Sequence, residues 1–285
     1  MCTSLFLWNT HPTLLLLVVF NRDEVLARPT QAAHFWPDWP SLLAGRDTRG
    51  GGTWLGVTTN GRFAMLTNFR EVAYDAVKNA PSRGALTTNF LQSNIEPLQY
   101  LQSLHEKGYN GFNLVVGDFG KQKLAYFSNR ANRTAYELEP GLYGISNGVL
   151  ESSWPKVEQG KAQLQWFLDQ AIDTEKLDPD MLLHHVMSNT AKVQQLQELP
   201  QTGMPVEIER LMSSIFIEPC ELKGAAYGTR SQTVLMVHRS GKAQLHERSR
   251  PDMDYKSQSH AHGDDWTCVH QSFDWSSTAT ASLSC

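Results

Sequence analysis

The second residue of the chain, Cys2, is the side chain whose type and position could do chemistry. Removal of Met1 is expected when residue 2 is small, and it would leave Cys2 with both a thiol and a free α-amine. The reference pKa values of these groups are about 8.5 and about 7.7 to 8.0, so the amine could take the thiol proton near neutral pH. Cys2 would then supply both the nucleophile and the base. The alternative is that Cys2 is a small apolar residue at the start of a strand.

Three polar residues at the ends of predicted strands could complete a site around Cys2. Arg22 follows the strand that should pair with the one that Cys2 begins, and a nearby cation favours a thiolate. Asn68 and Asn147 each end a further predicted strand, and side-chain amides can hold an oxyanion. Groups at strand ends can converge on one rim of a fold. Taken singly, these residues are also typical of ordinary turns.

Other motifs indicate weaker sites. The glycine triplet 50–52 lacks the Gly-Lys-Ser/Thr of a phosphate-binding loop, so we predict a tight backbone passage beside Cys2 instead. A solvated histidine-rich tail explains four residues that could otherwise bind a metal ion, namely His260, His262, Cys268 and His270. We therefore predict no metal site. The chain also has no Cys-x-x-Cys-His signal for covalent haem attachment.

The elements that would position these residues are mostly strands. Apolar segments bounded by turn residues predict strands at 2–8, 13–20, 53–58, 62–68, 112–117, 123–127, 134–138, 142–146, 231–237 and 243–246. Helix signals begin near Ser82, Pro97, Pro155, Pro179 and Pro205. The segment 28–52, rich in proline and aromatic residues, is predicted to be a long irregular loop. This order, without alternation of strand and helix, is typical of an α+β fold with two antiparallel sheets.

Composition and charge narrow the class of protein. The 285 residues are 41% hydrophobic, and 25 Lys and Arg against 29 Asp and Glu give a net charge of −4, which argues against a nucleic-acid partner. Four scattered cysteines make no disulfide framework and favour a reduced, cytoplasmic setting. The longest apolar run, 14–20, is far shorter than the ~20 residues that span a bilayer, so we predict no transmembrane segment. We assign residues 1–248 to one domain and 249–285 to a poorly ordered polar tail.

Several segments together resemble the transport and Golgi organization 2 family, also called the NRDE family. They are MCT (1–3), FNRDE (20–24), ARP (27–29), AGRD (44–47), GTWLG (52–56), YGISN (143–147) and GTRS (228–231). As a set, these motifs are very specific, and the match covers about residues 1–248. The family resembles more remotely the N-terminal nucleophile hydrolases of the choloylglycine and penicillin V acylase group. This resemblance implies a four-layer αββα sandwich, in agreement with the order of the predicted elements.

The resemblance also implies the site residues. The matching positions are the nucleophile Cys2, the adjacent arginine Arg22, the two asparagines of the oxyanion region Asn68 and Asn147, and the late arginine Arg230. The acylases carry an Asp three residues after the first arginine, where this chain has Val25. Here Asp23 directly follows Arg22, and adjacent side chains on a strand face opposite ways. Whether Asp23 can hold the α-amine therefore decides whether hydrolytic chemistry is retained.

Two functions follow as expectations. The resemblance implies a factor for Golgi organisation, protein secretion and intracellular haem trafficking, which would be cytoplasmic with peripheral association at Golgi or mitochondrial membranes and would carry haem as a transported ligand. The alternative is an N-terminal cysteine hydrolase that cleaves a linear amide or an acyl thioester through an acyl-Cys2 intermediate and requires no cofactor. In either case the partner is a small molecule, haem or an acyl compound.

Overall fold

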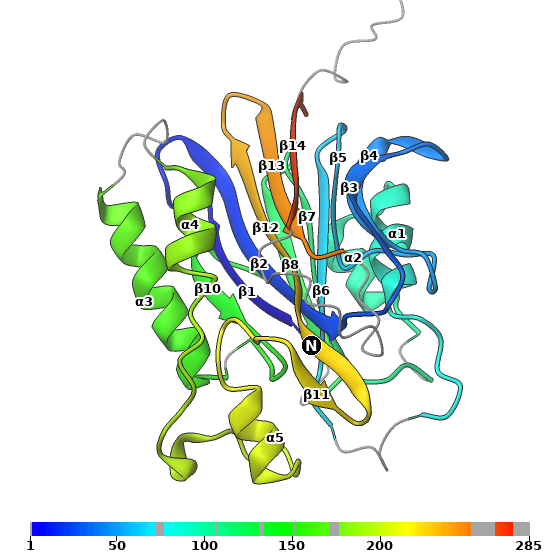
Figure 1. The fold of residues 1–285 in the computed structure, drawn as a ribbon. Helices are drawn as coiled ribbons and strands as arrows, with labels where there is room; N and C mark the ends of the chain where they lie inside the picture. The colour runs from blue at the N-terminus through cyan, green and yellow to red at the C-terminus, as the bar shows by residue number, and fades with distance from the viewer. Residues whose placement is uncertain are drawn as a thin grey trace, which may run out of the picture.

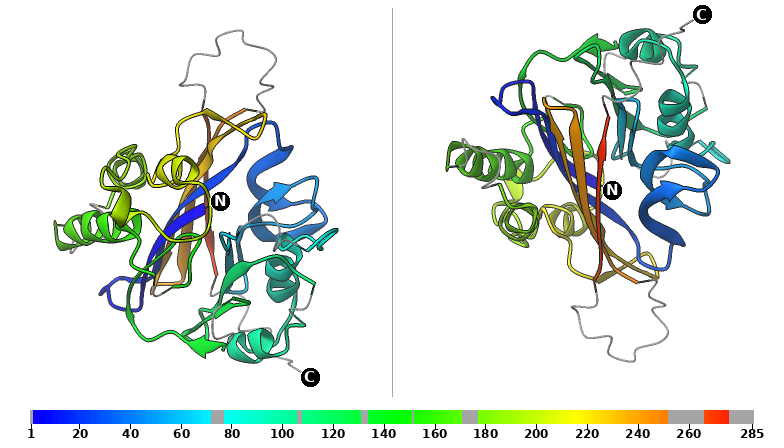
Figure 2. Two further views of the ribbon diagram at one scale, coloured as in Figure 1. Left: turned by 90° about the horizontal axis from the view of Figure 1, so that it is seen from below. Right: turned by 90° about the horizontal axis from the view of Figure 1, so that it is seen from above.

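Two antiparallel sheets packed face to face, with helices on the outer side of each, make up the computed structural model (Figures 1 and 2). It describes residues 2–71, 77–105, 108–130, 134–150, 152–170, 177–251 and 266–275. The layers run helices, sheet, sheet, helices, as Figure 2 shows from below and from above. The predicted αββα sandwich of two antiparallel sheets is confirmed.

The first sheet contains both ends of the described chain. Its strand order is β10-β1-β2-β12-β13-β14, with β11 paired to β12. The bounds are β1 Cys2–Trp8, β2 Leu14–Val25, β10 Gly141–Ile145, β11 Cys220–Leu222, β12 Ala225–His238, β13 Lys242–Ser249 and β14 Thr267–Asp274. The apolar run in β2 was predicted to be a strand covered on both faces, and all ten residues from Leu14 to Asp23 are buried.

The second sheet follows the chain order from β3 to β9 without a crossover. The bounds are β3 Thr30–Trp36, β4 Trp39–Asp47, β5 Leu55–Thr58, β6 Arg62–Asn68, β7 Phe112–Asp118, β8 Lys123–Ser128 and β9 Tyr136–Glu137. Several neighbouring strands are joined by short turns, such as the Asn60-Gly61 turn between β5 and β6, where Gly61 has a φ of 82°, whereas two helices lie between β6 and β7. Each strand of this sheet therefore pairs with the next strand along the chain.

The helices cover the outer faces. On the first sheet lie α3 Pro155–Gln170 and α4 Pro179–His185, and α5 Val206–Leu211 follows at one end (Figure 1). On the second sheet lie α1 Gly84–Gln92 and α2 Pro97–Gln102. A short 3-10 turn spans Leu196–Glu198. The predicted helix starts at Pro97, Pro155 and Pro179 are confirmed, whereas α1 begins two residues after Ser82, which makes no side-chain cap.

Strand alternation divides β1 and β2 between two cores. In β1, Phe6 and Trp8 belong to the core between the sheets, whereas Leu5 and Leu7 pack under α3 and α4. The register of the hairpin places Cys2 directly opposite Arg22. One end of this hairpin therefore brings the thiol and the arginine together.

The predicted irregular loop at 28–52 is wrong, because most of it forms the hairpin of β3 and β4. Pro29 precedes β3, Pro37 lies in the turn, and Pro40 is the second residue of β4, so the prolines lie at the ends of the two strands. The register shifts twice along the pair, which disguises the alternation in the sequence. After β4 ends at Asp47, the segment 48–52, which contains the glycine triplet, forms turns and bends.

The prediction of a poorly ordered tail from 249 is wrong for residues 267–274, which form β14 and pair with β13. The strand is largely exposed, so its sequence is polar, but Val269 and Phe273 on one face pack against the inter-sheet core. Phe273 meets Phe35 of β3 with 5.8 Å between ring centroids, and Trp275 meets Phe119 at 5.5 Å. His260 and His262 lie outside the described residues, and His270 faces His246 across β13 and β14.

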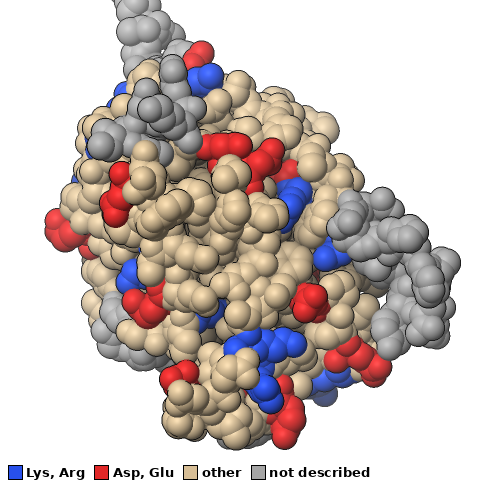
Figure 3. Space-filling view, turned by 60° about the vertical axis from the view of Figure 1, so that its left-hand side comes forward, with Lys and Arg blue, Asp and Glu red and all other residues tan. Residues whose placement is uncertain are grey.

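Over the described residues, no helix is both long and apolar enough to cross a membrane. Positive and negative side chains are interspersed on the face shown in Figure 3, which is the mixed surface expected from the small net charge of −4. Within the same described ranges, no group of three or more His, Cys, Asp or Glu could hold a metal ion.

Candidate functional site at the amino-terminal cysteine

A pocket of about 440 Å³ has Cys2 in its wall, and we call it the Cys2 pocket. Charged groups dominate its lining, together with backbone from two glycine-containing segments. The charged residues are Arg22, Asp23, Glu24, Arg28, Asp47, Arg49 and Arg83; the others are Cys2, Gly50, Gly52, Thr53, Trp54, Leu66, Asn68, Ala80, Pro81, Ser82, Gly84 and Asn110. Four arginines against three carboxylates leave the lining with an excess of positive charge.

The Cys2 thiol is buried, and its ionisation is opposed. Burial raises the pKa of Cys2 to about 11. The positive charge of the amino terminus, Arg22 and the backbone N–H of Asp23 favour the thiolate, whereas the Asp23 carboxylate opposes it. In this state the thiol is protonated at neutral pH, so nucleophilic chemistry would require a base or a change at the amino terminus.

Arg22 lies beside Cys2, as predicted, and several groups hold it in place. Its guanidinium lies 4.2 Å from the centroid of the Trp54 ring, and Nη1 donates to Thr30 Oγ1 at 3.3 Å. Nη2 is 3.8 Å from Asp47 Oδ2 and 3.9 Å from Glu24 Oε2. These contacts orient a buried charge toward the pocket without neutralising it with a single close carboxylate.

The segment from Asp47 to Gly52 forms the loop that closes one side of the pocket. Asp47 Oδ1 accepts the backbone N–H groups of Arg49 at 3.0 Å and Gly50 at 2.9 Å, while Oδ2 accepts Arg28 Nε at 2.7 Å. A Cβ on Gly52 would lie 2.4 Å from the carbonyl carbon of Gly84, the first residue of α1. The glycine is required because two backbones touch there, which confirms the predicted tight passage beside Cys2.

The side chains of residues 21–24, at the end of β2, point alternately to the two faces of the first sheet. Asn21 points under the helices, where Nδ2 donates to the carbonyls of Met187 at 2.8 Å and Ile215 at 2.9 Å. Asp23 lies on the same face as Asn21, as alternation predicts, and its Oδ1 accepts Thr229 Oγ1 at 2.8 Å. Burial raises the pKa of Asp23, and the amino-terminal charge is the strongest influence in the opposite direction. Asp23 therefore does sense the amino terminus, although it faces away from Arg22.

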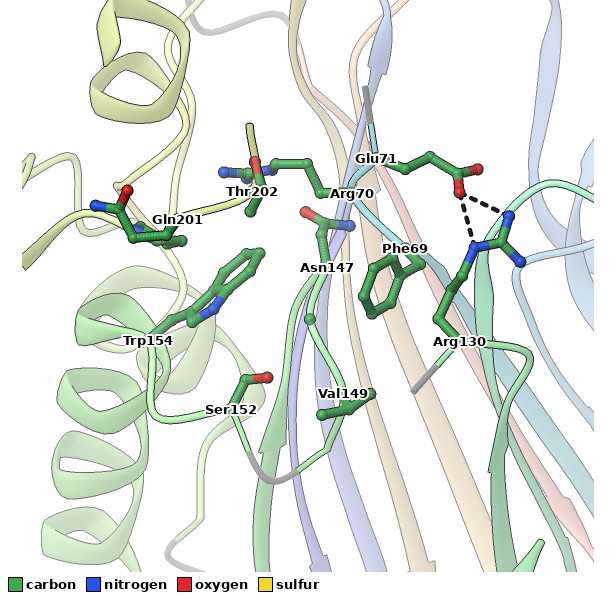
Figure 4. Close-up of a pocket in the computed structure, with 12 residues that line it drawn as sticks. Phe69, Arg70, Glu71, Arg130, Asn147, Val149, Ser152, Trp154, Gln201 and Thr202 are labelled. Carbon is green, nitrogen blue, oxygen red and sulfur yellow. Dashed lines mark hydrogen bonds and ion pairs between the residues drawn. The ribbon is translucent and has the colours of Figure 1, made fainter. Parts of the chain in front are cut away.

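The two asparagines lie close together but line different pockets. Asn68 lines the Cys2 pocket at the end of β6. Asn147 lines a second pocket, shown in Figure 4, and its Nδ2 donates to the backbone carbonyl of Asn68 at 2.7 Å. Ser146, between β10 and Asn147, donates to the Cys2 carbonyl at 2.9 Å. The structure thus brings both asparagines next to Cys2, with the Asn147 amide already committed to the backbone of Asn68.

Arg230 does not line the pocket and lies behind Arg22. It occupies an irregularity in β12, because Thr229 pairs with Asp23 and Ser231 pairs with Arg22, which leaves Arg230 as the extra residue. Its Nη1 donates to the Leu26 carbonyl, and it shares the Thr30 hydroxyl with Arg22. This arrangement suits a positioning role for Arg230 and no direct contact with a ligand in the pocket.

A buried charged cluster near the amino terminus had no signal in the sequence. Lys156 and Glu209 are each 3% exposed and Arg70 is 6% exposed. Lys156 Nζ donates to the Met212 carbonyl at 3.0 Å, and Arg70 Nη1 pairs with Glu209. Burial, together with the charge of Arg70, lowers the pKa of Lys156 to about 8, and the Asp23 carboxylate acts in the opposite direction. A lysine at the second position of a polar helix is typical of a solvated residue, so only the fold reveals it.

Two solved structures align with this chain at low sequence identity and low TM-score. The mutant C2A conjugated bile acid hydrolase from Clostridium perfringens aligns with a TM-score of 0.48 and 9% identity, covering 96% of this chain and 92% of that one. The N-acylethanolamine-hydrolyzing acid amidase orthologue of Caenorhabditis elegans aligns with a TM-score of 0.36 and 12% identity, covering 71% of this chain and 95% of that one.

Sequence relatives are much closer. The Transport and Golgi organization protein 2 homolog of Bos taurus is 34% identical over 264 residues, which cover 87% of this chain and 93% of that protein. The homolog of Homo sapiens is 34% identical over 268 residues, 89% of this chain and 95% of that protein. Transport and Golgi organization protein 2 of Drosophila melanogaster is 24% identical, covering 95% of this chain and 97% of that protein. The family model for Transport and Golgi organisation 2 matches residues 1–252, and the chain belongs to this family.

Proposed function

We propose that the chain acts in transport and Golgi organisation, the processes for which its relatives are named, by binding a small anionic molecule in the Cys2 pocket. The observation that carries this proposal is the concentration of four arginines around one buried thiol. Arg49 and Arg83 have no carboxylate within ion-pair distance among the described residues, so their charges are available to a carboxylate or phosphate group.

The proposed role also implies a location in the cell. A protein that serves Golgi organisation would work on the cytoplasmic side, with peripheral association at Golgi or mitochondrial membranes. Cell fractionation of the full chain tests this part: recovery in a salt-washable membrane fraction supports it, and recovery only in the lumen of either organelle contradicts it.

A rescue experiment tests the pocket. In cells that lack the endogenous protein, the unchanged chain should restore the secretion rate of a reporter and the Golgi morphology, and the double substitution Arg49→Ala with Arg83→Ala should not. Arg46→Ala is the matched control, because Arg46 pairs with Asp38 at 2.7 Å and does not line the pocket. Full rescue by the double variant would show that this pocket does not carry the function.

Haem is the first ligand that we propose for the pocket. The Cys2 thiol could bind the iron and the arginines could pair with the propionate carboxylates. Titration of the purified chain with haem should then give a saturable shift of the Soret band, and Cys2→Ala should abolish the thiolate form of that spectrum. No saturable shift, or an identical spectrum for Cys2→Ala, would remove haem as a ligand of this site.

The second candidate function is hydrolysis of a linear amide or an acyl thioester. It is favoured by the position of Asp23, whose backbone N–H favours the Cys2 thiolate and whose carboxylate senses the amino-terminal charge. Once Met1 is removed, the α-amine of Cys2 would take the thiol proton, and the sulfur would attack the carbonyl carbon. The C–S bond forms as the substrate C–N or C–S bond breaks, the ammonium protonates the leaving group, and water then releases the acyl group as a carboxylic acid.

The state of residue 2 decides this candidate. Intact mass of the natural protein should show a chain that begins at an unmodified Cys2, and a mixture of acyl amides and acyl thioesters should be turned over by this chain but not by its Cys2→Ser variant. A retained Met1 or an acetylated amine removes the base and rules out this mechanism, without affecting the binding proposal.

A further inference from the structure

A second pocket, of about 580 Å³, contains a buried arginine that the proposed function does not use (Figure 4). We call it the Arg70 pocket. It is lined by Phe69, Arg70, Glu71, Arg130, Asn147, Gly148, Val149, Ser152, Trp154, Pro200, Gln201 and Thr202, and neither Cys2 nor any of the four arginines of the Cys2 pocket is among them. The two linings are adjacent where Asn147 Nδ2 donates to the Asn68 carbonyl.

Arg70 is held at the wall of this pocket with one edge of its guanidinium unused. The side chain is 4% exposed, and Nη1 pairs with Glu209 of α5. Within the described part of the chain, Nε and Nη2 have no hydrogen-bond partner. These two nitrogens form the same edge of the guanidinium and donate in parallel, which is the geometry that a carboxylate accepts side-on. A buried charge with two donors that lack acceptors lowers the stability of the fold unless a ligand or water accepts from those donors.

Aromatic and aliphatic side chains line the pocket together with Arg70. The Arg70 guanidinium lies 4.8 Å from the centroid of the Trp154 ring, and Figure 4 shows the Arg70 side chain extending above that ring toward Thr202. Phe69, Val149 and Pro200 supply further apolar surface. The lining therefore offers one charged anchor beside an apolar body, the usual composition of a site for an amphipathic small molecule.

The second arginine of the pocket shows the same chemistry already satisfied. Arg130 presents Nε and Nη2 to Glu71 Oε2, at 2.8 Å and 2.6 Å. The edge of Arg130 is thus occupied by a carboxylate of the chain, whereas the equivalent edge of Arg70 is not. This contrast identifies Arg70, and not Arg130, as the anchor for an external group.

We propose that the Arg70 pocket binds a small organic carboxylate with an apolar body, whose carboxylate accepts from Nε and Nη2 of Arg70 and whose body packs on Trp154. Glu209 on the far edge of Arg70 opposes the incoming charge, and Lys156, which lies with Arg70 and Trp154 around a small adjoining cavity, offsets it. The site is independent of the Cys2 pocket, so its failure and the failure of the proposed function are separate results.

Calorimetric titration of the full chain with octanoate tests the site, with octanol as the uncharged probe of similar length. We expect saturable binding of octanoate and at least tenfold weaker binding of octanol, because the two hydrogen bonds to a charged group contribute most of the affinity. Arg70→Lys keeps the charge that pairs with Glu209 but removes the parallel donors, and it should weaken octanoate binding at least tenfold. Arg46→Lys is the matched control and should change it little, because Arg46 lines neither pocket.

Two further variants test the Arg70 pocket if Arg70→Lys does not fold. Val149→Trp fills the pocket from a partly exposed loop position without touching the buried pair, and it should abolish binding. The double variant Arg49→Ala with Arg83→Ala removes two charges of the Cys2 pocket, so octanoate binding that persists in this variant belongs to the Arg70 pocket. No saturable binding to the folded chain, equal binding of octanol, or loss of binding only in the Arg49 and Arg83 variant would overturn the proposal.

Discussion

Reactivity of Cys2 toward an aromatic disulfide should depend on the form of the amino terminus. Burial raises the pKa of the thiol from an ordinary value of 9.0 to about 11, so its thiolate fraction at neutral pH is roughly a hundredfold below that of a free thiol. A more basic thiolate is intrinsically more nucleophilic, with a Brønsted coefficient of about 0.4 to 0.5, so each thiolate reacts roughly tenfold faster. The net expectation for the chain that begins Met1-Cys2 is a rate roughly tenfold below free cysteine, rising with pH through the alkaline range.

The assay compares two preparations of the chain. One begins with Met1, and in the other Cys2 is made the first residue by proteolytic removal of an added leader; modification of Cys2 is followed by peptide mass as a function of pH. Cys268 of β14 is exposed and gives the internal reference for an accessible thiol. With Cys2 first, the α-amine should bring the inflection of the rate down to about pH 8. An inflection near pH 8 in the preparation that retains Met1, or none in the other, would show that the α-amine of Cys2 is not the base.

Three stability predictions follow, each measured by denaturant titration. Burial raises the pKa of Glu247 to about 7, so its stabilising contribution is complete below pH 4.5 and lost as pH rises through about 7; Glu247→Gln should remove this decline of roughly 3 kcal/mol. The pKa of Lys156 is lowered to about 8, so the unchanged chain should gain stability relative to Lys156→Met between pH 8 and 10.5. Gly52→Ala, whose Cβ would meet Gly84, should cost about 1 to 3 kcal/mol, against less than about 0.5 for Gly120→Ala.

The architecture was largely predictable because several strand pairs are local hairpins, although β1 with β10 and β2 with β12 join distant parts of the chain. A short turn after Trp8 fixes the pairing of β1 with β2, and once both strands are recognised, Cys2 and Arg22 must lie near each other. The β3 and β4 hairpin escaped prediction because its register shifts break the alternation, and β14 because an exposed edge strand needs few apolar residues. In both cases the apolar alternation that marks a strand is weak in the sequence, and neither error changes the predicted layers.

The site was predictable only where it depends on strand ends. Cys2, Arg22 and Asn68 meet at one pocket because each lies at an end of a strand near the same rim. The Arg70 and Glu209 pair joins residues 139 positions apart, and no local spacing encodes such a contact. Likewise, the sequence predicts Asn147 at a strand end, and it lies just after β10, but the direction of its amide depends on the carbonyl of Asn68 across the interface of the two sheets.

The pleat of β2 explains why the charge of the amino terminus affects the pKa values of both Cys2 and Asp23. At one strand end Arg22 and Asp23 both line the Cys2 pocket, and the Asp23 carboxylate also interacts with Lys156 of the buried cluster, so the terminus lies between two charged environments. After burial, the amino-terminal charge has the largest influence on the pKa of both Cys2 and Asp23, and it lowers both. Acetylation would remove that charge and raise both pKa values further, so an acetylated chain should be the least reactive form. Processing of the first residue would therefore set the protonation of the pocket before any ligand enters it.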